Sequence, residues 1–127
     1  MATVLLVDDE PDILLMLRMS FEDEGHQVVT AANGEQALQR LAEGGIDAVV
    51  LDMMMPVVDG WGVLRGKLAT GDTTPVIVVS AKSDARDAEK VVELGAVDYV
   101  MKPFDLDGLI RLVTDVVNRP PSSAASS

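Results

Sequence analysis

The chain contains no cysteine among its 127 residues, which excludes disulfide bonds and thiol chemistry. Aromatic residues make up only 3% of the sequence, so a packed interior must be built from the aliphatic residues and Met. Basic residues are also scarce, with 10 Lys and Arg against 21 Asp and Glu, which gives a net charge of -11. That charge, with no run of Lys and Arg to offset it, argues against direct binding to nucleic acid or to anionic lipid.

Long hydrophobic runs are absent as well. The apolar stretch from Ala2 to Val7 is too short for a membrane span, and the acidic residues that follow it do not suit a signal peptide. We therefore expect a soluble, cytoplasmic protein. The length predicts one compact domain, at residues 1–119, and residues 120–127 contain only Pro, Ser and Ala, which is typical of a tail or of the start of a linker.

What the chain does contain is a regular alternation of two patterns. Short apolar runs rich in β-branched residues alternate with longer stretches of helical period, which is the signature of βα units that feed a parallel sheet. The second run is shorter and more polar, as expected of an edge strand. The sequence thus predicts an α/β fold with a doubly wound five-stranded parallel sheet and five helices. The predicted strands are Val4–Val7, Val28–Ala31, Ala48–Leu51, Val76–Val79 and Val97–Met101.

Signals for helix starts lie between these runs. Pro11 with Asp12 opens the first helix, and Asn33 with Gln36 resembles a capping box. Gly60 lies near the start of the third helix, and Asp84 and Asp105 are candidate N-caps for the last two.

Informative polar residues follow the strands. In a doubly wound sheet the ligand site lies outside the carboxyl ends of the strands, so these residues should share one rim. Any one of them alone is more simply a helix cap or a solvated surface group, but together they indicate a site. They are Asp8, Asp9 and Glu10 after the first strand, Asp52 after the third, Ser80 and Ala81 after the fourth, and Lys102 and Pro103 after the fifth.

Several carboxylates at one rim would repel one another unless a cation neutralised them. Because the side-chain donors are all oxygen atoms, a hard ion is favoured, and Mg²⁺ is the natural choice. A carboxylate can attack phosphorus to form an aspartyl phosphate, which needs alignment and neutralisation of the phosphoryl oxygens. Asp52 is the predicted nucleophile because it ends the middle strand, with Lys102 and Ser80 available to contact the phosphoryl oxygens.

These residues resemble the receiver domain of bacterial two-component response regulators, over residues 2–118. The matching segments are V-L-L-V-D-D-E, V-V-L-D-M-M-M-P-V-V-D-G, I-V-V-S-A and G-A-V-D-Y-V-M-K-P-F, in the order of that family. The resemblance implies a flavodoxin-like sheet of strand order 2-1-3-4-5. It also implies a switch that is phosphorylated by a sensor histidine kinase or phosphotransfer protein and acts on a downstream effector protein or fused output domain. Such a switch is not a turnover enzyme, although it catalyses its own phosphorylation and dephosphorylation, and it is a monomer or a phosphorylation-dependent dimer.

The resemblance also assigns residue roles. Asp52 becomes the phosphoacceptor, with Asp9 as a direct Mg²⁺ ligand, Asp8 as a ligand through water and Met54 as a ligand through its backbone carbonyl. Lys102 becomes the phosphate-binding cation and Ser80 the switch hydroxyl. Tyr99 becomes an aromatic switch that remodels the face of helix four, strand five and helix five. Ala81 and Pro103 become loop residues of the site.

Three other functions compete with this interpretation. A phosphatase of the aspartyl-phosphate class would need an acid two residues after the nucleophile, where this chain has Met54. A flavin-binding electron carrier would need a hydroxyl-rich loop after the first strand, where this chain has three acids. The remaining alternative is a receiver-like interaction module that is never phosphorylated, and the intact acid pair, Asp52, Ser80 and Lys102 argue against it.

Outside the rim, the first helix carries a second pattern. Ile13, Met16, Leu17 and Phe21 form its predicted core stripe, whereas Leu15 and Met19 point away from it. These two residues either dock a partner such as the kinase or are ordinary scattered surface residues. We expect His26 to be a solvated surface residue, and we assign no function to Trp61.

Overall fold

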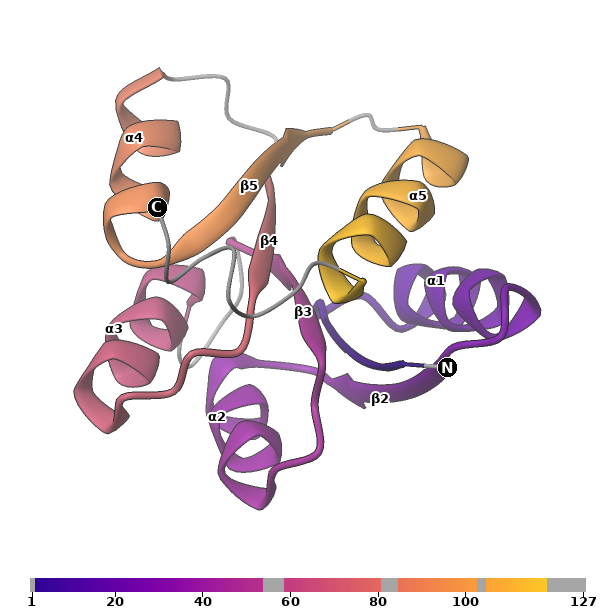
Figure 1. Ribbon diagram of the computed structural model, residues 1–127, viewed down its shortest axis with the longest axis horizontal. Coiled ribbons are helices and arrows are strands. Elements are labelled where there is room, and N and C mark those ends of the chain that lie inside the picture. Colours follow the sequence, from indigo (N-terminus) through magenta and orange to yellow (C-terminus); the bar gives the residue numbers. More distant parts are fainter. Residues whose placement is uncertain (1, 54–58, 81–84, 103–104, 119–127) are drawn as a thin grey trace.

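The computed structural model describes residues 2–53, 59–80, 85–102 and 105–118 of the chain. Within this part of the chain, five strands alternate with five helices, as the sequence pattern predicts (Figure 1). The elements are β1 (Thr3–Val7), α1 (Pro11–Asp23), β2 (Gln27–Ala31), α2 (Gly34–Glu43), β3 (Ala48–Asp52), α3 (Gly60–Thr70), β4 (Val76–Ser80), α4 (Ala85–Glu93), β5 (Ala96–Met101) and α5 (Leu106–Val117). No helix in the described ranges is long and apolar enough to cross a membrane.

The five strands form one parallel sheet in the order β2-β1-β3-β4-β5, which confirms the predicted doubly wound topology. β2 lies at an edge and is only partly buried, whereas every residue of β3 and β4 is buried. Each strand is one residue longer than predicted: β1, β2 and β5 begin one residue earlier, whereas β3 and β4 end one residue later, because backbone pairing does not depend on an apolar side chain. This extension brings Asp52 and Ser80 into β3 and β4 as their final residues.

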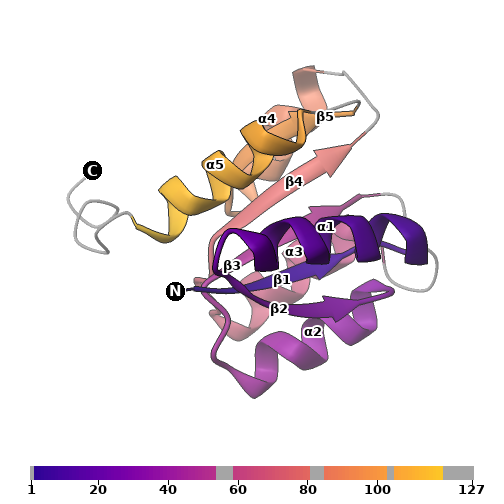
Figure 2. The same ribbon diagram turned by 90° about the vertical axis from the view of Figure 1, so that its right-hand side faces the viewer.

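The helices cover the two faces of the sheet. α2, α3 and α4 lie on one face and α1 and α5 on the other, as the two views show (Figures 1 and 2). Alternate side chains of each strand feed two separate hydrophobic clusters, one on each face. Leu5, Val49 and Val78 belong to the α2–α3–α4 face, for example, and Leu6, Val50 and Val79 to the α1–α5 face.

Polar side chains begin three of the helices. Asn33, Asp59 and Asp105 each accept a hydrogen bond from the backbone N–H three residues ahead, at the starts of α2, α3 and α5. Gln36 also accepts a hydrogen bond from the Ala32 backbone, so the predicted capping box at Asn33 is largely confirmed. Asp84, the predicted cap of the fourth helix, lies outside the described residues.

The set of α1 residues that face the core differs from the prediction in one position. Leu17 and Phe21 are buried as expected, and Ile13 is partly buried against the same cluster. Met16, however, is 42% exposed, so its assignment to the core stripe was wrong. Leu14, which is partly buried against the cluster, takes that place, because α1 is rotated slightly from the face that its apolar residues suggest. Met16 therefore joins Leu15 and Met19 on the exposed surface of α1.

Candidate phosphoacceptor site at the carboxyl rim of the sheet

The carboxyl ends of four strands present the polar residues that the sequence singles out. Asp8 directly follows β1, Asp52 ends β3, Ser80 ends β4, and Lys102 directly follows β5. Parallel pairing of β1 with β3, β3 with β4 and β4 with β5 aligns these ends at the same edge. Three of the four side chains are almost inaccessible: Asp8, Asp52 and Ser80 are 4%, 5% and 3% exposed. Burying polar groups raises the free energy of the folded state unless they form hydrogen bonds or ion pairs with one another or with a ligand.

Strand alternation separates the rim into two groups. Asp8 continues the series of Val4 and Leu6, and Asp52 continues that of Ala48 and Val50, so both carboxylates lie toward the α1–α5 face. A small cavity of about 10 Å³ confirms this placement, because it is lined by both carboxylates, by Lys102 and by side chains of α1. This volume is at the limit for one water molecule.

Lys102 bridges the two buried carboxylates. Its Nζ lies 3.6 Å from Oδ2 of Asp52 and 4.0 Å from Oδ2 of Asp8, while its own side chain remains 29% exposed. The backbone N–H of Lys102 donates a 2.8 Å hydrogen bond to the carbonyl of Ser80, which fixes the chain where it leaves β5. The ammonium group is therefore held beside Asp52 and still reaches solvent, where a further anionic group could contact it.

The surroundings of Asp8 disfavour the charged form of its carboxylate and raise its pKa. Burial raises the pKa of Asp8 to about 6, although a 2.9 Å hydrogen bond from the Glu10 backbone N–H opposes this effect. The negative charge of Asp52 raises the pKa further, and the positive charge of Lys102 lowers it. The positive charge of Lys102 thus does not offset the effect of burial on Asp8.

The acidic residues have the chemistry to hold a divalent cation. Carboxylate oxygens of Asp8, Asp9 and Glu10 all lie within 4.8 Å of one another, and the last two residues are exposed. Such a set of oxygen donors suits Mg²⁺, and the raised pKa of Asp8 is the mark of a site that a cation would stabilise. The sequence prediction named Asp8 and Asp9 but not Glu10 as a ligand; Met54, the predicted backbone ligand, lies outside the described residues.

The chain that follows Asp52 returns close to its starting point. The backbone N–H of Gly60 donates a 3.3 Å hydrogen bond to the carbonyl of Met53, so α3 begins directly beside the end of β3. A Cβ atom at Gly60 would lie 2.8 Å from Cα of Met53 and would also collide with the Met53 sulfur. Only glycine allows this approach, and the predicted role of Gly60 near the start of the third helix is thereby explained.

Ser80 and Tyr99 occupy the other face of the sheet. Ser80 continues the alternation of Val76 and Val78, which pack on the α2–α3–α4 face, and Tyr99 packs against the same cluster. Tyr99 is paired in register with Val78, two residues before Ser80. The predicted switch residues are therefore close neighbours on one face, one strand apart. Ala81 and Pro103, the predicted loop residues, lie outside the described residues.

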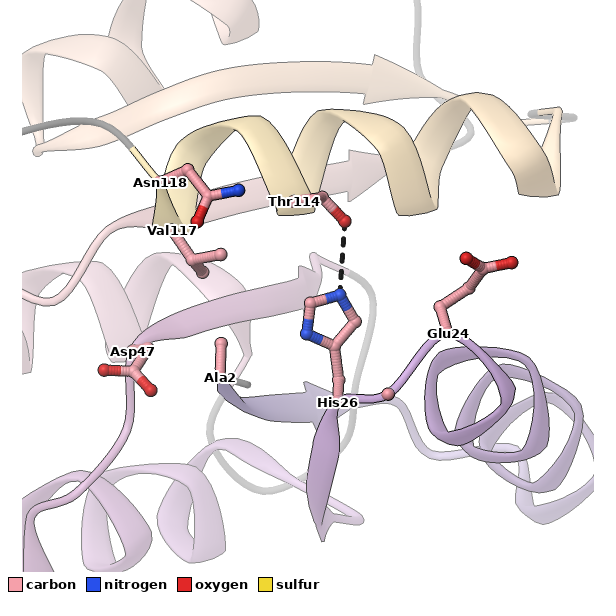
Figure 3. A pocket seen from close by; sticks show the side chains of 8 residues that line it. Ala2, Glu24, His26, Asp47, Thr114, Val117 and Asn118 are labelled. Atoms are coloured by element: carbon pink, nitrogen blue, oxygen red, sulfur yellow. Dashed lines mark hydrogen bonds between the residues drawn. The ribbon is translucent and has the colours of Figure 1, made fainter.

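Sequence reasoning missed a pocket at the opposite end of the sheet. It has a volume of about 520 Å³ and lies between the turn after α1 and the end of α5. His26 crosses this space to reach Thr114, with Asp47 and Glu24 at the margins (Figure 3). The expectation that His26 is a solvated surface residue was wrong, because its ring is partly buried and also packs against Phe21. No local pattern around a single histidine could have shown this.

The chain was compared with known proteins. The family model of the response regulator receiver domain matches residues 4–114. The transcriptional regulatory protein KdpE of Mycobacterium tuberculosis is 42% identical to this chain over 124 residues. The aligned region covers 98% of this chain and 54% of KdpE. The transcriptional regulatory protein PcoR of Escherichia coli is 36% identical over 99% of this chain and 56% of its own length.

Among solved structures, the receiver domain of the Francisella response regulator 1452 has a TM-score of 0.90 and 32% identity, covering 94% of this chain and 98% of that one. The chain spans about half the length of the curated relatives that it matches. The similarity to whole regulators is therefore a similarity to one of their parts.

Proposed function

The chain belongs to the response regulator receiver domain family, and we propose that within it Asp52 accepts a phosphoryl group from a phosphohistidine donor. Receiver domains are signalling switches rather than turnover enzymes. The observation that carries the proposal is the placement of the Asp52 carboxylate, which is 5% exposed at the end of the central strand with the Lys102 ammonium group 3.6 Å away. A buried carboxylate beside a partly exposed cation can attack a phosphoryl group whose oxygens that cation contacts.

The proposed transfer forms one bond and breaks another. A carboxylate oxygen of Asp52 attacks the phosphorus, the new oxygen–phosphorus bond forms, and the phosphorus–nitrogen bond of the donor phosphohistidine breaks with its electron pair on the imidazole. The ammonium group of Lys102 offsets negative charge on a phosphoryl oxygen, and the Ser80 hydroxyl donates a hydrogen bond to another. Catalysis of this step needs alignment and charge compensation only, so the chain promotes its own modification without being a turnover enzyme.

The acidic residues beside Asp52 fit a role in binding Mg²⁺. Asp8 and Asp9 would hold the ion with Asp52, Glu10 is a further candidate from the structure, and the Met54 carbonyl remains a prediction. When bound, Mg²⁺ would supply positive charge for the phosphoryl oxygens. Receiver domains generally use Mg²⁺ at such an acidic site.

The proposed switch uses Ser80 and Tyr99. Phosphorylation adds about two negative charges at the rim. The Ser80 hydroxyl would move toward the phosphoryl group, and Tyr99 would turn into the space that it leaves, since both residues lie on the α2–α3–α4 face of the sheet. Movement of Tyr99 within β5 would remodel the face formed by α4, β5 and α5, which is where we expect the signal to leave the domain.

The partners that follow are a sensor histidine kinase or phosphotransfer protein upstream and an effector protein or fused output domain downstream. We propose that this chain acts as a monomer or as a phosphorylation-dependent dimer and makes no direct contact with nucleic acid, because its net charge is -11. Its division into a receiver domain at residues 1–119 and a tail or linker at 120–127 and its cytoplasmic location stay predictions.

The test is phosphoryl incorporation from acetyl phosphate, measured by intact mass with and without Mg²⁺. We expect the wild-type chain to gain one phosphoryl group only with Mg²⁺, and Asp52→Asn to gain none. Asp47→Asn is a matched control, because Asp47 directly precedes β3, at the end opposite Asp52, and accepts a hydrogen bond from the Thr3 backbone. Incorporation by Asp52→Asn at the wild-type rate would overturn the assignment. No incorporation by the wild type would favour the alternative, an interaction module that is not phosphorylated.

A further inference from the structure

Residues of α3 and of the end of α4 line a groove. Figure 1 shows these two helices on the same face of the sheet. Trp61 and Arg65 of α3 line one side, and Lys90, Glu93 and Leu94 line the other. The volume of the groove is about 390 Å³, which is within the range of sites that bind ligands. Trp61 and Leu94 are partly buried and pack on the core, so they form an apolar floor, while the three charged residues are exposed.

The charge of this groove is opposite to that of the molecule. The whole chain carries 21 acidic and only 10 basic residues, yet two of those 10, Arg65 and Lys90, face the same groove against a single acid. Two other exposed cations are paired: Arg18 lies 3.3 Å from Glu22, and Arg40 lies 3.6 Å from Glu43. Within the described part of the chain, Arg65 and Lys90 form no ion pair. Both cations are thus available to a ligand.

The apolar surface continues beyond the groove along α3. Trp61, Arg65 and Leu68 follow the i, i+4, i+7 spacing that places residues on one face of a helix. Leu68 is 54% exposed, one turn beyond Arg65, and the adjacent side of the helix is buried through Val63, Leu64 and Lys67. A surface that extends past the groove by a helical turn, about 5 Å, is longer than a compact small molecule would require.

We propose that this α3–α4 groove binds an acidic peptide segment of a partner protein. Carboxylates of the segment pair with Arg65 and Lys90, and an apolar side chain packs on Trp61 and Leu94. The net charge of -11 repels acidic chains from the rest of the surface, so the groove selects both the partner and its position. Five lining residues make too small a patch for a standard protein interface, which fits a short segment better than a folded domain. The proposal does not depend on phosphoryl transfer at Asp52.

The experiment is a selection of peptides from a random library of about twelve residues displayed on phage, with the wild-type chain as bait. The Arg65→Glu, Lys90→Glu double variant serves for counter-selection. We expect the enriched peptides to combine Asp or Glu with at least one large apolar residue. The most enriched peptide is then titrated into the protein, and binding is followed by the fluorescence of Trp61, which is the only tryptophan in the chain.

A matched control separates the groove from the overall charge. Arg18→Glu, Arg40→Glu changes the net charge by the same amount as the groove variant but alters helices α1 and α2. We expect the groove variant to bind the selected peptide at least about tenfold more weakly and the control variant to bind within about threefold of the wild type. Equal circular dichroism spectra and unfolding midpoints of both variants ensure that folding is not the cause.

Four outcomes overturn the proposal. These are no enrichment over the counter-selection, enriched peptides that lack acidic residues, equal weakening by both variants, and weakening of peptide binding by neither. Sedimentation analysis adds one more test, because self-association that only Arg65→Glu, Lys90→Glu abolishes would make a second copy of this chain the occupant.

Discussion

The imidazole of His26 and the hydroxyl of Thr114 are joined by a 3.1 Å hydrogen bond between residues that are 88 positions apart in the chain. The Thr114 hydroxyl donates its hydrogen to the carbonyl of Ile110, at 2.8 Å, so it must accept from His26. The proton therefore resides on Nε2, and the other ring nitrogen, Nδ1, is buried with no partner in the described ranges. This bond joins the start of β2 to the last turns of α5 (Figure 3).

The first prediction concerns this bond. His26→Ala should lower the free energy of unfolding by about 1–3 kcal/mol, because it removes the hydrogen bond and the contact with Phe21. In a double-mutant cycle of His26→Ala with Thr114→Val, measured by urea denaturation, the coupling energy should be about 0.5–1.5 kcal/mol. Strictly additive effects would mean that the bond does not contribute to stability in solution.

The second prediction follows from the raised pKa of Asp8, about 6. Below this pH the proton competes with Mg²⁺ for the carboxylate, so the apparent affinity for Mg²⁺ should fall about tenfold for each pH unit below 6 and level off above it. Isothermal titration calorimetry between pH 5 and pH 7.5 measures this profile. Asp8→Asn should bind more weakly and show a flatter profile, and an equally steep profile in that variant would assign the proton to another group.

The same shift affects the stability of the metal-free protein. A raised pKa means that the folded chain holds the Asp8 proton more tightly than the unfolded chain does. Between about pH 4 and pH 6, the contribution of Asp8 to the free energy of unfolding should therefore decrease as pH rises. Asp8→Asn should remove this decrease, and saturating Mg²⁺ should oppose it, because the ion binds the ionised form in the folded state.

The third prediction concerns Lys67, which is 4% exposed although it carries a charge. Its Nζ lies 3.0 Å from Oδ1 of Asp72 and 3.2 Å from the carbonyl of the same residue. Burial raises the pKa of Asp72, but the hydrogen bonds from Thr74 and the contact with Lys67 outweigh burial and lower this pKa below its usual value. Lys67→Ala should cost about 2 kcal/mol at pH 7, since it leaves Asp72 without its cation.

The pH dependence of this pair has a definite sign. Because the pKa of Asp72 is lowered on folding, the pair stabilises the folded state fully above about pH 4, and its contribution is lost as pH falls through the folded pKa. The cost of Lys67→Met, compared by urea denaturation at pH 7 and pH 3, should shrink at the lower pH. Arg40→Met, which breaks an exposed pair with Glu43, is the control and should change stability little at either pH.

The fourth prediction addresses the exposed apolar side of α1. Leu15 and Met19 are 57% and 58% exposed, as expected of residues that point away from the core. If this surface docks the kinase, Leu15→Glu, Met19→Lys should slow phosphoryl transfer from a histidine kinase that acts on the wild-type chain by about tenfold. Its phosphorylation by acetyl phosphate should be unchanged. The control is Leu68→Glu, which changes an apolar residue of α3 that is 54% exposed. Equal transfer rates in the wild type, the α1 double variant and the control would mean that Leu15 and Met19 are ordinary surface residues.

Much of the fold could be predicted because its signals are local. A strand buried on both faces has a run of β-branched residues, and the caps at Asn33 and Asp105 lie three residues from the N–H groups that they accept from. The ends of the strands were less predictable, since backbone pairing adds one residue at the start of β1, β2 and β5 and one at the end of β3 and β4. The exposed position of Met16 depends on the rotation of α1 against β1 and β2, which an apolar periodicity defines only approximately.

By itself, the sequence determined which residues meet at the rim, because parallel strands must end at one edge and Asp8, Asp52, Ser80 and Lys102 each end or follow a strand. Only the tertiary structure decided how they meet: that Lys102 reaches both carboxylates, that burial raises the pKa of Asp8, and that Ser80 shares a face with Tyr99. The same is true of His26 with Thr114 and of the groove beside Trp61. Distances, burial and charge balance arise between residues far apart in the chain, and no local pattern encodes them.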